Sequence, residues 1–120
     1  MILLLLITGL ALAQGPSPDA LFKQGQEIFG DICAQCHRAN GEGLPDTFPA
    51  LNKNSFVVGD PQPVIATVLN GRHGKLGKMP TWKEKLNDQE IAAAVTYIRH
   101  AWSNRAPGVT PAMVAALRGK

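Results

Sequence analysis

The five residues Cys33-Ala34-Gln35-Cys36-His37 constrain this chain more than any other stretch, and they contain its only two cysteines. A structural zinc site normally needs four ligands, often from two cysteine pairs, and the chain has no second pair. A thioredoxin-like dithiol accompanies a βαβ unit, and the sequence shows no strand pattern. A Cys33–Cys36 disulfide is chemically possible in an exported protein, but it leaves the neighbouring His37 without a role.

The spacing C-x-x-C-H is the attachment pattern of a c-type haem. Two thiols three positions apart can form thioether bonds with the two vinyl groups on one edge of a haem. The adjacent imidazole is then held under the iron as an axial ligand. We therefore predict one covalently attached haem c, bound through Cys33 and Cys36, with His37 as the proximal iron ligand. A large apolar cofactor would also supplement the small core that a domain of this length can form.

Met79 is the strongest candidate for the second axial position of the iron. It lies in the glycine-flanked turn Gly77-Lys78-Met79-Pro80, within a loop that can reach across a haem face. Pairing of methionine with histidine raises the reduction potential, because a soft thioether favours ferrous iron. Met113 lies in an apolar stretch and is expected to fill the core. His73 is the rival ligand, and His100 is expected to face solvent.

The first thirteen residues, Met1 to Ala13, are apolar and uncharged, and they end in the small-residue pattern Ala11-Leu12-Ala13. This pattern predicts a secretory signal peptide (1–13) cleaved before Gln14, although the usual basic residue is missing from its start. The alternative is an uncleaved anchor, but a membrane span needs about 20 apolar residues. Both interpretations imply export to the periplasm or an equivalent compartment. The mature form is expected to have no membrane span and to begin with a flexible lead-in, 14–18.

The periodicity of apolar residues predicts helices joined by long loops, with no strand. The expected helices run from a cap at Asp19 to about Asp31, from Pro61 to Asn70, from Asp88 to about Trp102, and from Pro111 to about Arg118. Residues 38–60 and 72–85 are expected to be loops, which need a function or a packing partner in so small a domain. We therefore predict an all-α domain over 19–102, followed by a tail, 103–120, that contains a short helix.

Local signals mark where these helices begin, stop and meet. Asn87 with Glu90 forms a capping-box pattern, Gly71 is a stop signal, and Thr110 is a cap. Gly25 lies one turn before Phe29 on the same helix face. A glycine inside a helix costs about 1 kcal/mol relative to alanine. A close helix–helix approach would explain Gly25, and simple tolerance of a glycine is the alternative.

The charge balance is mildly basic, with a formal net charge of +3 and a pI near 9.1. The chain lacks the concentrated basic stripe of nucleic-acid-binding modules, so we expect no nucleic-acid partner. Five basic residues cluster around the second loop: Arg72, Lys75, Lys78, Lys83 and Lys85. They predict either a solvated loop or a docking surface for an acidic redox partner, where complementary charge speeds encounter.

Together these residues resemble class I cytochromes c, especially the monohaem bacterial type found as soluble carriers or as domains of periplasmic and oxidase complexes. The resemblance covers most of the chain after Gln14. It is carried by the attachment motif, Met79-Pro80, the first-helix pair Gly25 and Phe29, the aromatic pair Tyr97 and Trp102, and the tail Val109-Thr110-Pro111 with Leu117-Arg118. It further implies that the Pro49 carbonyl accepts the His37 ring N–H and that Leu51 packs on the haem. Trp82 is only a candidate for a propionate contact, and the other propionate-binding positions are left unassigned.

The resemblance implies the class I cytochrome c fold, with three main helices plus long loops wrapped around one covalently bound haem. It implies a one-electron carrier rather than an enzyme, with Met79 as the distal ligand and both axial sites filled. Such a protein is a monomer or a subunit of a redox complex. The alternatives are a haem enzyme or gas sensor with an open sixth site, and a permanent subunit of a larger dehydrogenase or oxidase.

Overall fold

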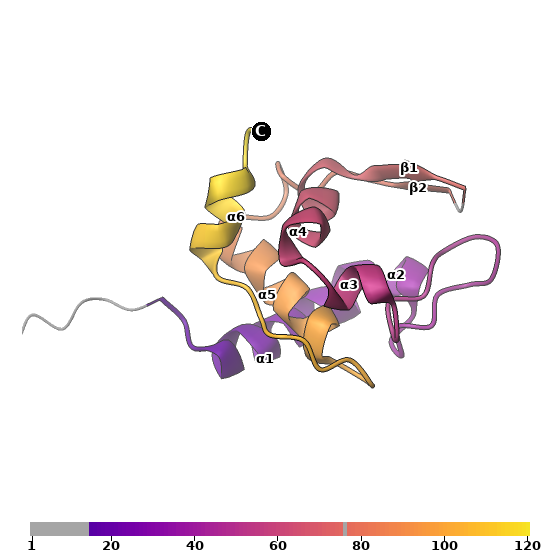
Figure 1. Cartoon of the computed structure of the whole chain (residues 1–120), viewed down its shortest axis with the longest axis horizontal. Coiled ribbons are helices and arrows are strands. Elements are labelled where there is room, and N and C mark those ends of the chain that lie inside the picture. Colours follow the sequence, from indigo (N-terminus) through magenta and orange to yellow (C-terminus); the bar gives the residue numbers. More distant parts are fainter. Residues whose placement is uncertain (1–14, 76) are drawn as a thin grey trace, which may run out of the picture.

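A computed structural model describes residues 15–75 and 77–120 of the chain. The predicted signal peptide, 1–13, and the first residue of the lead-in lie outside the described residues. The helical elements are α1 (Pro18–Ile28), the π-helix η1 (Phe29–Cys33), α2 (Ala34–His37), α3 (Ser55–Val58), α4 (Pro61–Asn70), α5 (Asp88–His100) and α6 (Pro111–Leu117). Two strands, β1 (Arg72–Gly74) and β2 (Gly77–Met79), pair as an antiparallel hairpin (Figure 1).

The start of α1 differs from the predicted one. Ser17 is the cap, because its hydroxyl accepts a hydrogen bond from the Ala20 N–H at 3.1 Å. Pro18 takes the first helical position, where a missing N–H leaves no bond unmade. The prediction that Asp19 is the cap is therefore wrong. Asp19 lies in the first turn instead, where the helix dipole favours an acidic side chain.

The end of the first helix also differs from the prediction. Helical backbone does not stop near Asp31 but continues through η1 and α2 to His37. The π-helical turn adds residues to the helix without breaking it. The helix stops at Arg38, whose φ of 64° lies in the left-handed region. The attachment motif is consequently held on helical backbone rather than on a loop.

Gly25 allows α1 to cross directly against α5. A Cβ atom built on Gly25 would lie 2.6 Å from the carbonyl carbon of Ala93 and 2.8 Å from Cβ of Tyr97, and it would also overlap the Ala93 carbonyl oxygen. Distances under 3.0 Å leave no room for a side chain against backbone atoms. The close-approach interpretation of Gly25 is therefore confirmed, and simple tolerance of the glycine is excluded.

Aromatic side chains pack beside this crossing. The Phe29 ring lies 5.4 Å from that of Tyr97 and 5.3 Å from that of Trp102, centroid to centroid. Tyr97 and Trp102 lie 5.6 Å apart, in an edge-on arrangement that aromatic rings favour. Phe29, on η1, is fully buried by this contact. The cluster fixes η1, and with it the first cysteine of the motif, against α5.

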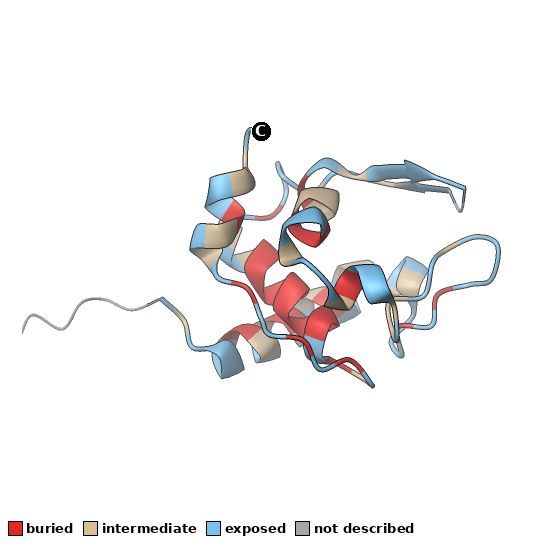
Figure 2. Ribbon diagram, in the orientation of Figure 1, coloured by how far each residue is buried: buried red, intermediate tan, exposed pale blue. Residues whose placement is uncertain are grey.

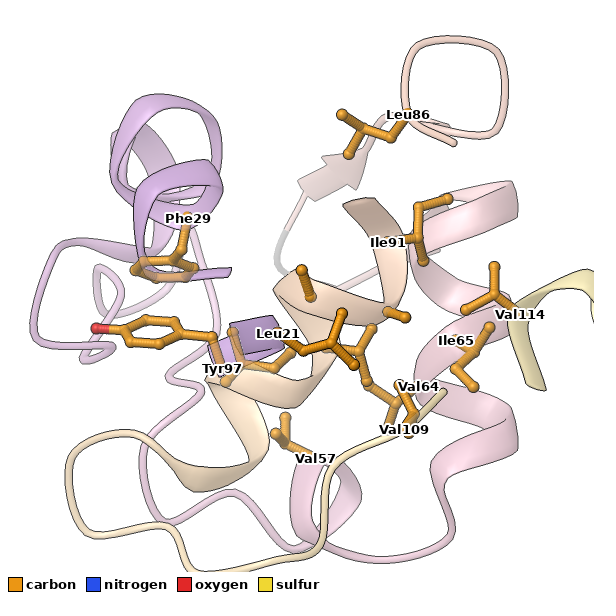
Figure 3. Packing of buried hydrophobic residues seen from close by; sticks show 14 of the residues in the cluster. Leu21, Phe29, Val57, Val64, Ile65, Leu86, Ile91, Tyr97, Val109 and Val114 are labelled. Carbon is orange, nitrogen blue, oxygen red and sulfur yellow. The ribbon is translucent and has the colours of Figure 1, made fainter. Parts of the chain in front are cut away.

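Helix α5 is the central element of the core (Figure 2). Its predicted capping box is confirmed, since Asn87 and Glu90 each accept a hydrogen bond from the other's backbone N–H, at 2.8 and 3.0 Å. Every residue from 91 to 99 is buried. A helix buried all round must be covered from several sides. Helices α1, α4 and α6 supply that cover, and side chains from all of them meet those of α5 in Figure 3.

The predicted helix from Pro61 to Asn70 is present as α4. Asp60 caps it by accepting from the Gln62 N–H at 3.0 Å, and Gly71 ends it with a φ of +74°. The predictions for the two loops are corrected in part. Residues 38–60 contain the short helix α3, and residues 72–85 contain the hairpin. Strands of three residues, exposed except at Met79, are too short to show an alternating pattern.

The tail packs on the same core. Thr110 caps α6 as predicted, and Pro111 takes its first position. Val109 and Val114 are buried within the cluster that also holds α4 and α5 (Figure 3). The fold is mostly helical, and the exposed hairpin is the one departure from all-α within the described ranges. In those ranges, no helix reaches the length and hydropathy that a bilayer crossing demands.

Candidate haem-binding site

The two cysteines lie one helical turn apart on the continuous first helix. Cys33 is the last residue of η1 and is half-buried, whereas Cys36 lies in α2 and is exposed. Both are free thiols. Burial, and to a lesser extent the neighbouring Cys36, raises the pKa of Cys33 to about 11. A thiol of this kind is protonated at neutral pH, which argues against a thioredoxin-like reactive pair.

The imidazole of His37 is held by a backbone carbonyl. Its Nδ1 lies 3.0 Å from the carbonyl oxygen of Pro49. A carbonyl only accepts, so Nδ1 carries the hydrogen and Nε2 keeps its lone pair. Burial lowers the pKa of His37, and the bond to Pro49 opposes this effect. The ring is therefore neutral at pH 7, with one nitrogen in the form that binds a metal.

Two glycines bring Pro49 to this position. Gly43 has a φ of +61°, and a Cβ there would lie 2.6 Å from the Pro49 carbonyl oxygen. The Gly43 N–H donates to the His37 carbonyl at 2.9 Å, which returns the chain to the end of α2. The Gly41 carbonyl accepts from the N–H groups of Leu51 and Asn52, at 2.7 and 2.9 Å. The loop is thus closed around Pro49 by backbone hydrogen bonds.

Several apolar side chains pack on the core yet keep part of their surface exposed. This set is Ile32, Leu51, Val68 and Trp82. Leu44 and Phe56 are the large hydrophobic residues with the greatest exposure, 40% and 38%, within the described part of the chain. They lie in the loop after α2 and in α3. Single exposed apolar side chains are ordinary on a protein surface, but a large apolar cofactor that covered several of them would bury them. Together with two free thiols and an oriented imidazole, these residues fit a covalently held apolar disc such as haem.

Met79 ends β2 and is half-buried. A Cβ on Gly71 would lie 2.5 Å from the Met79 carbonyl oxygen, so the hairpin returns directly against the end of α4. The Thr81 hydroxyl donates to the Leu69 carbonyl at 2.5 Å, and the Trp82 N–H donates to the Val68 carbonyl at 3.1 Å. Figure 1 shows the hairpin and α2 extending toward the same end of the molecule. The pairing of Met79 with His37 on one iron stays a prediction.

The other candidate residues have distinct environments. His73 lies in β1 and is exposed. His100 is exposed as expected, with its ring edge-on to Phe22 at 6.1 Å. Met113 packs, partly buried, against the core cluster, as expected. Trp82 has Lys85 Nζ 5.5 Å from its ring centre, and nothing in the structure tests it as a propionate contact.

The five predicted basic residues are all exposed. Arg72 and Lys78 lie on the hairpin strands and Lys75 in the turn between them. Lys83 and Lys85 lie in the turn that follows Trp82. The Arg72 guanidinium sits 5.0 Å from the centre of the Phe56 ring. Across residues 15–75 and 77–120, no three His, Cys, Asp or Glu side chains gather into a group that could hold a metal ion.

Two buried polar residues near the site were not predicted from the sequence. Arg99 is 3% exposed and donates to the carbonyls of Val57, Gly59 and Pro107, at 2.7, 2.8 and 2.8 Å. Burial lowers its pKa, and nearby Asp60 opposes this. Asn104 is 2% exposed. Arg99 lies within an apolar helix pattern and Asn104 just after it, and a charged or amide residue at such a position is the only signal the sequence carries.

Comparisons with known proteins show the family to which this chain belongs. A family model described as cytochrome c oxidase, cbb3-type, subunit III, matches residues 20–98. The chain is 34% identical over 97 residues to the cytochrome c subunit of the alcohol dehydrogenase (quinone) of Gluconobacter oxydans, covering 73% of this chain and 20% of that protein. It is 33% identical over 112 residues to cytochrome c-552 of Thermus thermophilus, covering 83% of this chain and 69% of that protein.

A third relative is the cbb3-type cytochrome c oxidase subunit FixP of Sinorhizobium medicae, 32% identical over 91 residues, with 74% of this chain and 30% of that protein covered. The chain spans about a fifth of the length of the dehydrogenase subunits that it matches. The family match contains the attachment motif, α4, the hairpin and most of α5. The chain therefore belongs to the cytochrome c family, with haem c as its covalently attached cofactor.

Proposed function

We propose that this chain is an exported one-electron carrier whose haem c is attached to Cys33 and Cys36 and ligated by His37 and Met79. The observation that carries the proposal is the His37 ring, which follows two free thiols and donates Nδ1–H to the Pro49 carbonyl at 3.0 Å. This bond leaves Nε2 as the free nitrogen and makes it more basic. The same arrangement has no evident use in a zinc site, a dithiol oxidoreductase or a plain disulfide.

The mechanism follows from what each side chain holds. When bound, haem c supplies an iron that alternates between the ferric and ferrous states, one electron at a time. Pro49 fixes the orientation of the His37 ring, and Met79 contributes a thioether that favours the ferrous state. The half-buried Leu51 and Val68 offer apolar surface that excludes water from the site. Fixed ligands in an apolar site keep the structural change on electron transfer small.

We propose the class I cytochrome c arrangement, in which the helices around α5 and the loops of the site enclose one haem. With both axial positions filled by side chains, no iron position remains for a substrate. The protein is then a carrier rather than an enzyme or a gas sensor. The proposal is supported by Met79, which lies at the end of a strand packed against α4 instead of within the apolar core.

The proposed partners are redox proteins that meet the exposed basic residues around the hairpin. Three relatives are named as subunits of an alcohol dehydrogenase, a gluconate 2-dehydrogenase and a cbb3-type oxidase. We infer that this chain exchanges electrons with a dehydrogenase or an oxidase, as a free carrier or as a subunit. We also infer that it works in the periplasm or an equivalent compartment, since its first thirteen residues have the composition of a signal peptide.

Covalent attachment is tested by expressing the chain in a host that matures c-type cytochromes. The exported protein is separated on a denaturing gel, stained for haem, and weighed by mass spectrometry. We expect the mass of one haem on the native chain and none on the double variant Cys33→Ala/Cys36→Ala. Each single variant should retain at most one thioether bond. Haem that dissociates from the native chain on denaturation would contradict the proposal.

A further inference from the structure

Asn104 is a buried amide whose side chain makes two long-range hydrogen bonds to the site loop, the segment 38–54 that carries Pro49. Only 2% of its surface is exposed. Its amide nitrogen donates to the carbonyls of Leu51, at 3.0 Å, and Ile98, at 2.7 Å, and its oxygen accepts from the Lys53 N–H at 2.9 Å. Both amide hydrogens and the carbonyl oxygen are therefore satisfied. A buried amide bonded in this way specifies one arrangement of the backbone around it.

The backbone that Asn104 binds is strained. Lys53 has a φ of 57°, in the left-handed region that residues other than glycine rarely adopt. Such a conformation persists only where its surroundings hold it. The Asn104 side chain bonds the Lys53 N–H and the Leu51 carbonyl, and it therefore holds the backbone on both sides of Asn52. This contact accounts for the backbone conformation at this point of the loop.

The neighbours of Asn104 bind the other parts of the same loop. The Trp102 indole donates to the Ala39 carbonyl at 2.8 Å, and its ring lies directly against Gly41. The Ser103 N–H donates to the Asn52 side chain at 3.0 Å. Residues 102–104 therefore touch both ends of the loop, at the place where the Gly41 carbonyl closes it. Of this segment, only Asn104 is a buried polar anchor.

Pro49, whose carbonyl orients His37, lies two residues before the first of these anchored groups. We propose that Asn104 is a positioning residue for the proximal ligand: it fixes residues 51–53 so that the Pro49 carbonyl meets the His37 ring. The inference rests on the proposed ligation by His37. Loss of the Asn104 side chain removes the side-chain partner of the Leu51 carbonyl and of the Lys53 N–H, both of which are partly buried. The loop then relaxes, and the hydrogen bond from His37 to Pro49 opens more often.

The test uses the reduced holoprotein and follows the Nδ1 proton of His37 by proton NMR. In the native protein this proton should exchange slowly with solvent, since it is bonded to Pro49. Asn104→Ala should accelerate its exchange about tenfold or more. Asn87→Ala is the matched control, because it removes the cap at the opposite end of α5 and destabilises the protein without touching the loop. Asn87→Ala should accelerate the exchange no more than its effect on global unfolding requires.

The outcomes separate the two proposals. A native protein without a haem-shifted His37 signal would contradict the proposed ligation itself. A native signal with equal exchange in Asn104→Ala and Asn87→Ala would overturn the role of Asn104 alone. Where Asn104→Ala fails to accumulate as holoprotein, Asn104→Asp carries the test, because it keeps an oxygen for the Lys53 N–H and removes the N–H groups that bond the Leu51 and Ile98 carbonyls. A smaller acceleration in the same direction supports the inference, and an unchanged rate in Asn104→Asp contradicts it.

Discussion

At the scale of single residues, Gly25 and Gly43 bring backbone into contact with backbone at two places that position the site. Gly25 seats the first helix on α5, and Gly43 seats the loop of Pro49 on the end of α2. Neither contact leaves space for a methyl group. The position of the attachment motif thus requires glycine at both of these places, because a side chain at either one would separate the packed backbones.

Gly25→Ala should destabilise the holoprotein by about 3 kcal/mol or more, since the new methyl group meets backbone of α5 that cannot turn aside. Gly30→Ala is the matched control on the same helix. A Cβ at Gly30 has open space within 4 Å, and its φ is not positive, so this change should be neutral or stabilise by up to about 1 kcal/mol. Unfolding in guanidinium chloride, followed by circular dichroism, measures both. Equal midpoints would contradict the close approach.

Met79→Ala should lower the reduction potential and allow carbon monoxide to bind the ferrous protein, because it removes the thioether that favours ferrous iron. Met113→Ala is the control, since Met113 packs on the core away from the hairpin. Met113→Ala should reduce stability while leaving the potential unchanged. Potentiometry of both variants decides between the two methionines. An unchanged potential and spectrum in Met79→Ala would refute Met79 as ligand and return His73 to consideration.

At the scale of elements, the hairpin and its junction with α4 set where Met79 lies. Gly71 ends α4 at a φ of +74° and lies under the Met79 carbonyl. The segment after the hairpin is tied back to α4 by Thr81 and Trp82. Arg118 of the tail pairs with Asp88 at 2.7 Å, and it also donates hydrogen bonds to the carbonyls of Lys83 and Leu86, in the turn that follows Trp82. The segment 71–86, which contains Met79, is therefore held at both of its ends.

Gly71→Ala should loosen the proposed Met79 ligation, because the added methyl group strains a left-handed backbone and collides with the Met79 carbonyl. Gly74→Ala, in the same hairpin, is the control, since a Cβ there meets nothing within 4 Å and its φ is not positive. The measurement is the rate at which imidazole displaces the distal ligand from the ferric protein. We expect imidazole to displace the ligand about tenfold faster or more in Gly71→Ala, because the substitution strains the backbone, and at the native rate in Gly74→Ala. Matching rates in both variants would show that the junction does not hold Met79.

Elements with strong local signals could be predicted from the sequence, and those set by tertiary contacts could not. The helix 61–70 and the caps Asn87 and Thr110 followed from residue patterns alone. The continuation of the first helix to His37 could not be predicted, because it needs a π-helical turn and the packing of Phe29. The hairpin was missed because three-residue exposed strands carry no periodicity. The attachment motif could be predicted from five consecutive residues. The proposed role of Asn104 could not, because it depends on hydrogen bonds to residues 51 and 53 positions away in the sequence.

At the scale of the whole molecule, we propose that the exposed basic residues of the hairpin, Arg72, Lys75 and Lys78, form a positive surface, with Lys83 and Lys85 in the turn that follows Trp82. Their side chains are exposed, so their effect is long-range and reduced by salt. Charge of this kind changes the rate of encounter more than the affinity. The hairpin also carries the proposed distal ligand, Met79, at the end of β2 (Figure 1). Electron transfer near the hairpin should therefore depend on the charge of the partner.

The double variant Lys75→Glu/Lys78→Glu should slow oxidation of the reduced protein by ferricyanide, an anionic probe, and weaken the dependence of this rate on salt. Lys23→Glu/Lys120→Glu, on α1 and at the last residue, is the control, because it changes the net charge by the same amount at two exposed positions outside the hairpin. Stopped-flow measurement at low and high ionic strength compares the two variants with the native protein. A hairpin double variant no slower at low salt than this control would show that the basic residues only keep the loop soluble.

The central claim is that both axial positions of the haem iron are filled by side chains of this chain. The most direct test is the optical spectrum of the exported holoprotein, recorded oxidised, reduced, and reduced under carbon monoxide. We predict a low-spin, six-coordinate spectrum with a thioether-to-iron charge-transfer band in the oxidised state and no change with carbon monoxide. A high-spin spectrum that shifts with carbon monoxide would keep the haem but contradict the carrier, and would indicate catalysis or gas sensing instead.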